Sequence, residues 1–157
     1  MKKTSAGLLM YRMKNETLEV LLVHPGGPYW KNKDEGAWSI PKGEAENNET
    51  GNALLEVARR EFEEETGIKP IGDFKYLTSV NRKDGKVVEA WMFEGDCDPT
   101  QLKSNTIMIN WPPRSGRQIE IPEIDRGAFF NIEQAKIKIG YQLPFINEFE
   151  QWCKNRQ

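Results

Sequence analysis

A group of charged side chains stands near the middle of the chain, where Arg60, Glu61, Glu64 and Glu65 follow one another closely. On a helix, which turns once in about 3.6 residues, Glu61 and Glu65 are stacked at i and i+4, and Glu64 lies beside Glu61 at i+3. Three carboxylates on one patch repel each other unless a positive charge lies among them. Hard divalent cations such as Mg²⁺ bind through a few carboxylates together with substrate phosphates. The spacing therefore indicates metal-assisted phosphate chemistry.

The helix that must carry these side chains is predicted over residues 52–66. Thr50 or Asn52 can cap its start, and Gly67 suits the position after its end. The carboxylates then fall in the last turns, where the helix dipole disfavours anions. A Glu-rich helix is more often a solvated face than a site. Here the unfavourable position, and the glycine loop before the helix, favour a functional patch.

Short apolar runs on both sides of this helix are separated by turn residues and predict strands. These strands cover residues 5–11, 18–23, 38–41, 74–81, 87–94, 106–111 and 119–130, the last interrupted at Pro122. Two more helices are predicted at residues 132–139 and 144–154. Strands around one internal helix, followed by a helical tail, indicate an α/β fold with a mixed sheet covered by helices. We expect one domain, residues 1–157.

The composition excludes several classes of protein. A formal net charge of −2 provides no basic face, so we expect no nucleic-acid partner. No stretch is long enough to span a membrane, and the short apolar run that stops at Arg12 is interpreted as a strand rather than a signal peptide. Cys97 and Cys153 are too few for a disulfide framework and lack metal-ligand spacing, which favours a reducing, cytoplasmic setting.

Residues 43–68 resemble the signature of the Nudix hydrolase superfamily, G-x5-E-x7-R-E-U-x-E-E-x-G-U, in which U is apolar. Gly43 and Glu49 fit its first half, and the segment REFEEETGI at residues 60–68 fits its second half at every position. The segment WSIPKG at residues 38–43 resembles the strand that leads into this motif. The loop GGPYW before it is similar to that of a bacterial group of predicted NTP pyrophosphohydrolases.

The chain departs from this signature in the middle. Ten residues separate Glu49 from Arg60, where the family has seven. A loop absorbs three extra residues more easily than a helix does, so we place the insertion near residues 47–52. Glu46 or Glu56 could then take the place of Glu49.

The resemblance implies a Nudix-type α/β/α sandwich that hydrolyses a nucleoside diphosphate linked to another group, with Mg²⁺ or Mn²⁺ as cofactor. Water would attack a phosphorus of the pyrophosphate. Carried over by position, Glu61 and Glu65 would be the main metal ligands, and Glu64 a further ligand or a partner of the base. The carbonyl of Gly43 would complete the ligands, and Arg60 would hold a nearby carboxylate in place.

A further acid is expected outside this motif. In some members of the family it lies six residues before an aromatic residue on a later strand, and here Glu123 stands six before Phe129. Glu123 is therefore our candidate for another ligand or the general base, and Glu120 is the second choice. The alternative explanation is that Glu123 is an exposed acid at a strand end.

Candidates for substrate binding are cations and aromatic residues in loops. Lys42 directly precedes the motif and could reach a phosphate. Tyr29 and Trp30 could stack on a base, or could equally pack their loop onto the core. Arg114 and Arg117 form a second basic loop that could hold phosphate or ribose, or be solvated.

Two kinds of function compete for this chain. The first is hydrolysis of an NTP or dinucleoside polyphosphate by a monomer or homodimer. The second is a nucleotide-binding or regulatory module on the same fold that has lost catalysis. All three glutamates at positions 61, 64 and 65 are present, which favours the enzyme. His24, the single histidine, is interpreted as a polar residue at a strand end without a chemical role.

Overall fold

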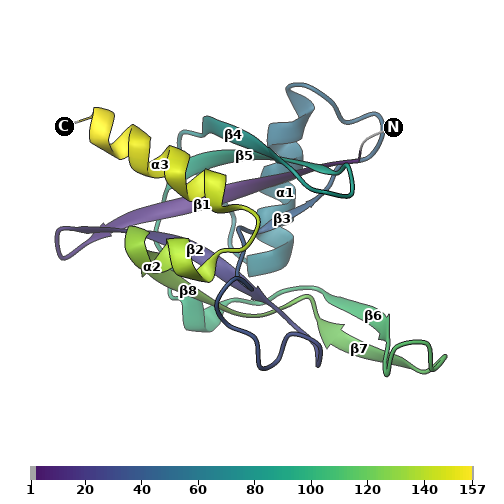
Figure 1. The fold of residues 1–157 in the computed structure, drawn as a ribbon. Helices are drawn as coiled ribbons and strands as arrows, with labels where there is room; N and C mark the ends of the chain where they lie inside the picture. The colour runs from purple at the N-terminus through teal and green to yellow at the C-terminus, as the bar shows by residue number, and fades with distance from the viewer. Residues whose placement is uncertain (1–2, 157) are drawn as a thin grey trace.

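The fold is described on a computed structural model for residues 3–156. In chain order its elements are β1 (Thr4–Lys14), β2 (Thr17–Pro25), β3 (Lys42–Glu44), α1 (Ala53–Thr66), β4 (Lys75–Asn81), β5 (Val87–Glu94), the short 3₁₀ helix η1 (Pro99–Gln101), β6 (Thr106–Asn110), β7 (Gln118–Pro122), β8 (Ile124–Asn131), α2 (Ile132–Lys138) and α3 (Leu143–Asn155). Figure 1 shows a twisted main sheet with helices against it and a small hairpin outside it. The predicted α/β class is confirmed.

The main sheet is mixed and is built around β1. Its strand order is β4-β5-β1-β2-β8, and β3 also pairs with β1. β5 runs parallel to β1, whereas β2 and β3 pair with it antiparallel at its two ends. Gly43 of β3 lies opposite Ala6 of β1. The start of the recognised motif is thereby fixed to the most central strand.

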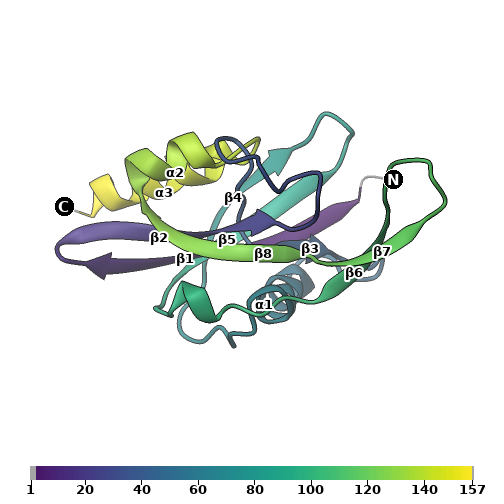
Figure 2. The ribbon, with the colours of Figure 1, turned by 90° about the horizontal axis from the view of Figure 1, so that it is seen from below.

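The side chains of β1 define the two faces of the sheet, since successive residues of a strand point to opposite sides. Ala6, Leu8 and Met10 join the apolar cluster that also contains the buried side chains of α1, whereas Leu9 joins the cluster of α2 and α3. Figure 2 shows α1 on one side of the sheet, and α2 with α3 on the other. The predicted α/β/α sandwich is confirmed.

Helix α1 is anchored by one fully buried face. Val57, Ala58 and Phe62 have no exposed surface. The ring of Phe62 meets that of Phe93 edge-on, with 5.3 Å between the centroids. The helix ends at Gly67 as predicted, with φ of 77° and its N–H donating to the carbonyl of Glu63 at 2.7 Å. This packing fixes which face of α1 remains free for the carboxylates.

The start of α1 lies where it was predicted, but its capping contact differs from the prediction. Asn52 occupies the N-cap position but makes no capping hydrogen bond through its side chain. The backbone carbonyls of Thr50 and Gly51 instead accept from the N–H groups of Ala53 and Leu54, at 3.2 and 3.1 Å. Asn52 is therefore the N-cap residue as predicted, but its side chain does not cap the helix, because the turn before the helix already supplies these acceptors.

The short strand predicted at residues 38–41 is also displaced along the chain. Trp38 and Ser39 form only isolated bridges, to Ile139 and Val23. The N–H of Ile40 donates a hydrogen bond to the side-chain oxygen of Gln142 at 2.9 Å, and Pro41 has no N–H to donate. A regular strand therefore forms only afterwards, as β3.

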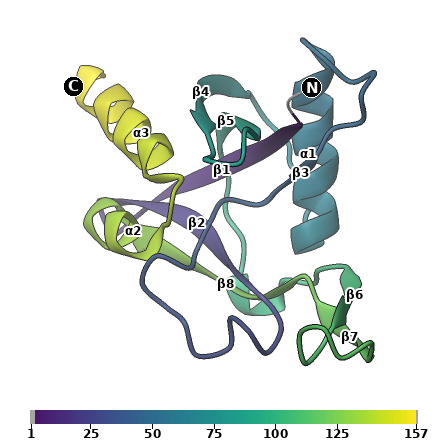
Figure 3. The ribbon, with the colours of Figure 1, turned by 45° about the vertical axis from the view of Figure 1, so that its right-hand side comes forward.

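The segment between β5 and β8 leaves the main sheet. β6 and β7 pair only with each other, and β7 and β8 separate at Glu123, one residue after the predicted interruption. We call residues 106–122, which comprise β6, β7 and their connecting turn, the arm. Figure 3 shows the arm projecting from the body of the molecule. Most of its side chains are exposed.

Two expectations drawn from composition concern the whole chain. Cys97 and Cys153 are both free thiols, in agreement with the absence of a disulfide framework. Within residues 3–156, no helix combines the length and the apolar character that crossing a bilayer requires.

Candidate functional site

Glu65 is the most deeply buried carboxylate of the site, with 5% of its surface exposed. It lies in the last turn of α1 and accepts a hydrogen bond from the backbone N–H of Lys42, at 2.7 Å from Oε2. Burial, followed by the nearby charge of Glu123, raises the pKa of Glu65 to about 8. A carboxyl placed here is costly to ionise on its own, so the site favours a compensating positive charge.

Glu61 lies one turn earlier and packs directly against Gly43. A Cβ atom at Gly43 would collide with the carboxyl group of Glu61, so a side chain at position 43 would displace that carboxylate. Burial and the charge of Glu64 raise the pKa of Glu61 to about 7. Glu64 itself is exposed. The glycine of the motif thus makes room for a carboxylate that α1 presents.

Arg60 is paired with Glu49 despite the insertion between them. Its Nη1 donates to Glu49 Oε2 at 3.0 Å, and its Nη2 lies 3.8 Å from Glu61 Oε1. Glu49 also accepts from the backbone N–H of Glu46 at 2.8 Å, whereas Glu56 pairs with Arg59 instead. Glu46, Glu49 and Glu56 were the three candidates for the first glutamate of the motif, and in the structure it is Glu49 that contacts Arg60. The extra residues are accommodated in the loop before α1.

Glu123 joins these side chains from the far end of the chain. It lies between β7 and β8 and is half-buried, and burial raises its pKa while the nearby Lys42 opposes that shift. Its backbone is held on both sides, because its N–H donates to the carbonyl of Asn105 at 2.8 Å and its own carbonyl accepts from Gly26 at 3.0 Å. Glu120, the second choice, is exposed on the arm.

Ser104 fixes the residue that follows Glu123. Its hydroxyl lies 3.1 Å from the backbone nitrogen and 3.0 Å from the backbone oxygen of Ile124, and so bridges both groups. Ser104 was not among the site residues predicted from the sequence. A single serine in a polar linker gives no sequence signal, and its contact depends on two segments that meet only in the fold.

The donor set suits a hard divalent cation. Glu61, Glu64, Glu65 and Glu123 supply carboxylate oxygens, and the raised pKa values of three of them result from burial and mutual repulsion that a cation would relieve. Among residues 3–156, no three His, Cys, Asp or Glu side chains are already gathered closely enough to hold an ion. The side chains would have to close around it.

A cavity of about 300 Å³ opens beside Glu65. Its lining includes polar side chains that sequence analysis did not select, namely Ser104, Asp125 and Arg126. The only sequence signal for the last two is a pair of charges within the otherwise apolar run that forms β8. The cavity lies between α1 and the start of β8, next to the candidate carboxylates.

The loop between β2 and Trp38, residues 26–37, carries the aromatic candidates, and we call it the aromatic loop. Tyr29 and Trp30 meet edge-on with 5.0 Å between their centroids. The ammonium of Lys33 lies 3.6 Å from the centroid of Tyr29 and 5.3 Å from that of Trp30. Tyr29 is 56% exposed. The two aromatic residues therefore form a surface cluster around a cation rather than part of the core.

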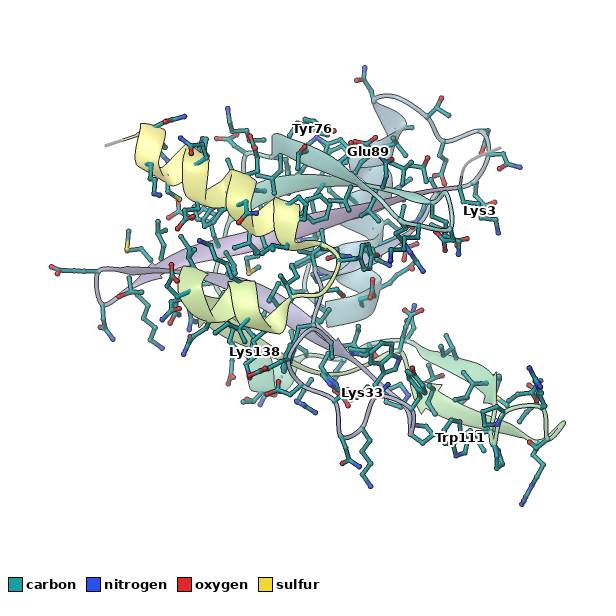
Figure 4. All side chains as sticks on the ribbon, in the orientation of Figure 1. Lys3, Lys33, Tyr76, Glu89, Trp111 and Lys138 are labelled. Atoms are coloured by element: carbon teal, nitrogen blue, oxygen red, sulfur yellow. The ribbon has the colours of Figure 1, made fainter. Side chains whose placement is uncertain are left out.

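The other substrate-binding candidates divide into two groups. Lys42 lies close enough to Glu65 and Glu123 to favour the ionised form of both. Arg114 and Arg117 lie in the turn of the arm, where no ion pair to a carboxylate is found among residues 3–156. Figure 4 shows Lys33 in the aromatic loop, and Trp111 on the arm beyond it. The arm cations are thus not brought to the carboxylates.

Comparison with known proteins gives a family and several solved structures. The model of the NUDIX domain matches residues 1–152. No curated protein matches the chain. A C. elegans Ap4A hydrolase in a binary complex is similar, with 19% identity and a TM-score of 0.64, and the match covers 98% of each chain. A MutT protein from Methanosarcina mazei Go1 has 22% identity and a TM-score of 0.62, and the match covers 99% of this chain and 96% of the other.

A third similar protein is *Shewanella oneidensis* NrtR. Its NUDIX domain, complexed with ADP ribose, has 14% identity and a TM-score of 0.64, covering 98% of this chain and 89% of that one. NrtR complexed with a 27mer DNA has 15% identity and a TM-score of 0.64, with 98% of this chain and 63% of that chain covered. At these identities the likeness concerns the fold.

Proposed function

Because the chain belongs to the NUDIX domain family, we propose that it is a pyrophosphohydrolase that uses Mg²⁺ or Mn²⁺ to split a nucleoside diphosphate linked to another moiety. We place NTPs and dinucleoside polyphosphates first as substrates. The observation that carries the proposal is the pair Glu61 and Glu65 on neighbouring turns of α1, whose pKa values are raised to about 7 and about 8 although Arg60 lies near the first carboxylate and Lys42 near the second. Such a pair favours a divalent cation.

The expected ligands of the divalent cation are grouped around Glu61 and Glu65. Glu61 and Glu65 would hold the cation, with Glu64 and the carbonyl of Gly43 as further ligands. When bound, the cation neutralises charge on the phosphate oxygens and lowers the pKa of water. The contact between Arg60 and Glu49 keeps the guanidinium beside Glu61, so that this carboxylate is held in one orientation.

The remaining residues would act on water and substrate. Glu123, or Glu64 in its place, would take a proton from the attacking water as its oxygen bonds to phosphorus. The bond from that phosphorus to the bridging oxygen breaks, which leaves two phosphate-ended products. The ammonium of Lys42 would meet the negative charge that develops on the leaving phosphate.

Recognition of the nucleotide would come from outside the motif. Tyr29 and Trp30 offer exposed rings on which a base can stack, and Lys33 beside them adds positive charge. Arg114 and Arg117 would meet a distal phosphate or ribose of a long substrate. On this proposal the carboxylates of α1, together with Lys42 and Glu123, perform the chemistry, while the aromatic loop and the arm select the substrate.

The test is a nucleotide panel with Mg²⁺, with products identified by mass. The panel should include NTPs, dinucleoside polyphosphates and ADP ribose. We expect turnover of at least one of these, cleavage between two phosphates, and loss of turnover when a chelator is added. Turnover that resists the chelator would contradict metal assistance, and the absence of any product across the panel would contradict the enzymatic function.

A second function is favoured by one comparison. NrtR carries a NUDIX domain in a protein that has been seen with ADP ribose and with DNA. The alternative proposal is therefore a nucleotide-binding or regulatory module without catalysis. It predicts tight binding of a nucleotide from the same panel, measured by calorimetry, with no product by mass. The presence of Glu61, Glu64 and Glu65 together on α1 argues for the enzyme.

A further inference from the structure

Gln142 is a polar side chain with no exposed surface, at the start of α3. It occupies the N-cap position of that helix, but its side chain makes no capping hydrogen bond. Its Oε1 accepts from the backbone N–H of Ile40 at 2.9 Å, and its Nε2 donates to the hydroxyl of Tyr141 at 3.2 Å. A buried amide is costly unless it is hydrogen-bonded. The oxygen of Gln142 therefore serves a segment 102 positions earlier in the chain rather than its own helix.

The segment that Gln142 contacts leads directly into the candidate site. Two of its N–H groups donate to side chains rather than to a neighbouring strand. The N–H of Ile40 donates to Gln142, and the N–H of Lys42 donates to Oε2 of Glu65 at 2.7 Å. The acceptor that Gln142 supplies is thus two residues away from the one that the buried carboxylate supplies.

The same segment is packed closely against β1. The N–H of Leu8 donates to the carbonyl of Pro41 at 3.2 Å. A Cβ atom at Gly7 would collide with that carbonyl oxygen and with side-chain atoms of Ile40 and Lys42, so the two stretches of chain lie in direct contact. The backbone of residues 40–42 is therefore held by β1, by α1 and, through Gln142, by the start of α3.

The contact with Gln142 is hard to replace. Ile40 has no exposed surface, so without the oxygen of Gln142 its N–H would be buried without a partner. We expect the segment to move until this group meets another acceptor. Pro41 would pass the movement on, because its ring fixes the backbone angle φ between Ile40 and Lys42. The N–H of Lys42 would then no longer meet Glu65 at its present distance.

From these contacts we propose that Gln142 is a positioning residue of the candidate site: it holds the backbone two residues before Lys42 and thereby sets Lys42 against Glu65. Its own hydrogen bonds go to Ile40 and Tyr141, so it acts through the backbone and not on substrate. Small displacements of reacting groups lower the rate of the chemical step. The kinetic part of this inference rests on the proposed hydrolysis, whereas the structural part does not.

The first test needs no substrate. In Gln142→Met a side chain of similar length replaces the amide, and the acceptor for Ile40 is lost. The diagnostic amide is that of Lys42, whose own acceptor, Glu65, is unchanged. We expect its protection from hydrogen exchange to fall by about tenfold more than that of Phe62 in α1, which reports the stability of the whole fold. Equal changes at the two amides would overturn the proposal.

Matched variants separate the lost acceptor from lost stability. Gln142→Glu keeps an oxygen that can accept from Ile40 in either protonation state, and it should restore most of the protection of Lys42. Ile146→Val shortens another buried side chain of α3 without removing a hydrogen-bonding group, and it should leave Lys42 unchanged relative to Phe62. Failure of Gln142→Glu to restore protection, or an equal loss in Ile146→Val, would contradict the assigned contact.

Circular dichroism checks that each variant is folded. If Gln142→Met does not fold, Gln142→Asn takes its place, because its amide remains polar but is one methylene too short to reach Ile40. The same loss of protection at Lys42 is then expected, and its absence would overturn the proposal in the same way.

The kinetic readout is the division of the effect between kcat and KM for the nucleotide that the panel identifies. We expect Gln142→Met to lower kcat by about tenfold and to change KM by less than about twofold, with Gln142→Glu within about threefold of the wild type. A kcat that stays unchanged, or that falls equally in Ile146→Val, would overturn the kinetic part. If the wild type hydrolyses no nucleotide, the proposed function fails, while hydrogen exchange still decides whether Gln142 positions Lys42.

Discussion

Helix α1 and the arm carry the two kinds of candidate residue in opposite settings. The carboxylates of α1 stand on a helix whose inner face, formed by Val57, Ala58 and Phe62, is fully buried. The arm presents Arg114 and Arg117 on a two-stranded hairpin with mostly exposed side chains. A hairpin of two strands has little stability of its own, whereas a packed helix places side chains within narrow limits.

The difference in packing between α1 and the arm indicates that the two regions have different functions. Phosphoryl chemistry depends on charges held in advance at fixed distances, and α1 can provide them. Recognition of a long or variable substrate tolerates movement, and exposed loops on a rigid scaffold are where such residues are usually found. We therefore expect substitutions on α1 to act on kcat, and substitutions on the arm to act on KM.

The largest expected effect comes from Glu65→Gln. The amide oxygen can still accept from the N–H of Lys42, so the fold should be preserved, but a buried anion is lost. We expect kcat to fall by about 100-fold or more, the scale found when one preorganised electrostatic group is removed. Single-turnover kinetics at saturating Mg²⁺ measure this.

Glu63→Gln is the matched control for that variant. Glu63 lies on the same helix but is exposed, and its backbone oxygen, which the substitution keeps, is the group that accepts from Gly67. We expect its kcat to stay within about twofold of the wild type. If both variants lose activity equally, the effect belongs to the charge of the helix as a whole, and the role assigned to Glu65 is wrong.

A smaller effect is expected on the stability of the protein without metal. The pKa of Glu65 is raised to about 8 and that of Glu61 to about 7, so the folded state binds protons more tightly than the unfolded chain does. The stability from these protons is complete below the ordinary carboxyl value of about 4.3 and is lost as pH rises through 7 and 8. We expect Tm of the metal-free protein to fall by several degrees between about pH 5 and about pH 9.

Magnesium and Glu65→Gln should each reduce this slope, for different reasons. The cation binds the ionised carboxylates and offsets their repulsion, whereas the amide of the variant does not ionise. Scanning calorimetry with chelator and with Mg²⁺, on wild type and variant, separates the two effects. A Tm that rises over this range without metal would contradict the assigned shifts.

The features that sequence predicted well are local ones. The helix, its end at Gly67 and the spacing of its carboxylates depend on residues within a few turns of each other. The choice of Glu49 over Glu46 and Glu56 was left open, because it depends on the path of a loop with three extra residues. The strand expected at 38–41 was misplaced, because a distant side chain, Gln142, takes the N–H of Ile40.

The rest of the site depends on contacts between distant segments. Gln142 was not among the residues predicted from the sequence, since the N–H group that it binds is 102 positions away in the chain. Ser104 was missed for the same reason. Arg114 and Arg117 were grouped with the site by residue type, but the hairpin carries them outward. Residue type therefore predicted which carboxylates come together better than it predicted what surrounds them.

The smallest expected effect comes from the arm. Replacing Arg114 and Arg117 together by glutamine should raise KM by about threefold and leave kcat unchanged, because exposed charges interact weakly with phosphate through water and salt. A double variant of Lys14 and Lys83 to glutamine removes the same charge from the end of β1 and from the turn between β4 and β5, and should not change KM. Steady-state kinetics at low and moderate ionic strength measure both, and the arm effect should shrink as salt is added. A loss in kcat comparable to that of Glu65→Gln would show that the arm takes part in the chemical step, and the two regions would then not differ in function. An unchanged KM would show that the arm does not bind substrate.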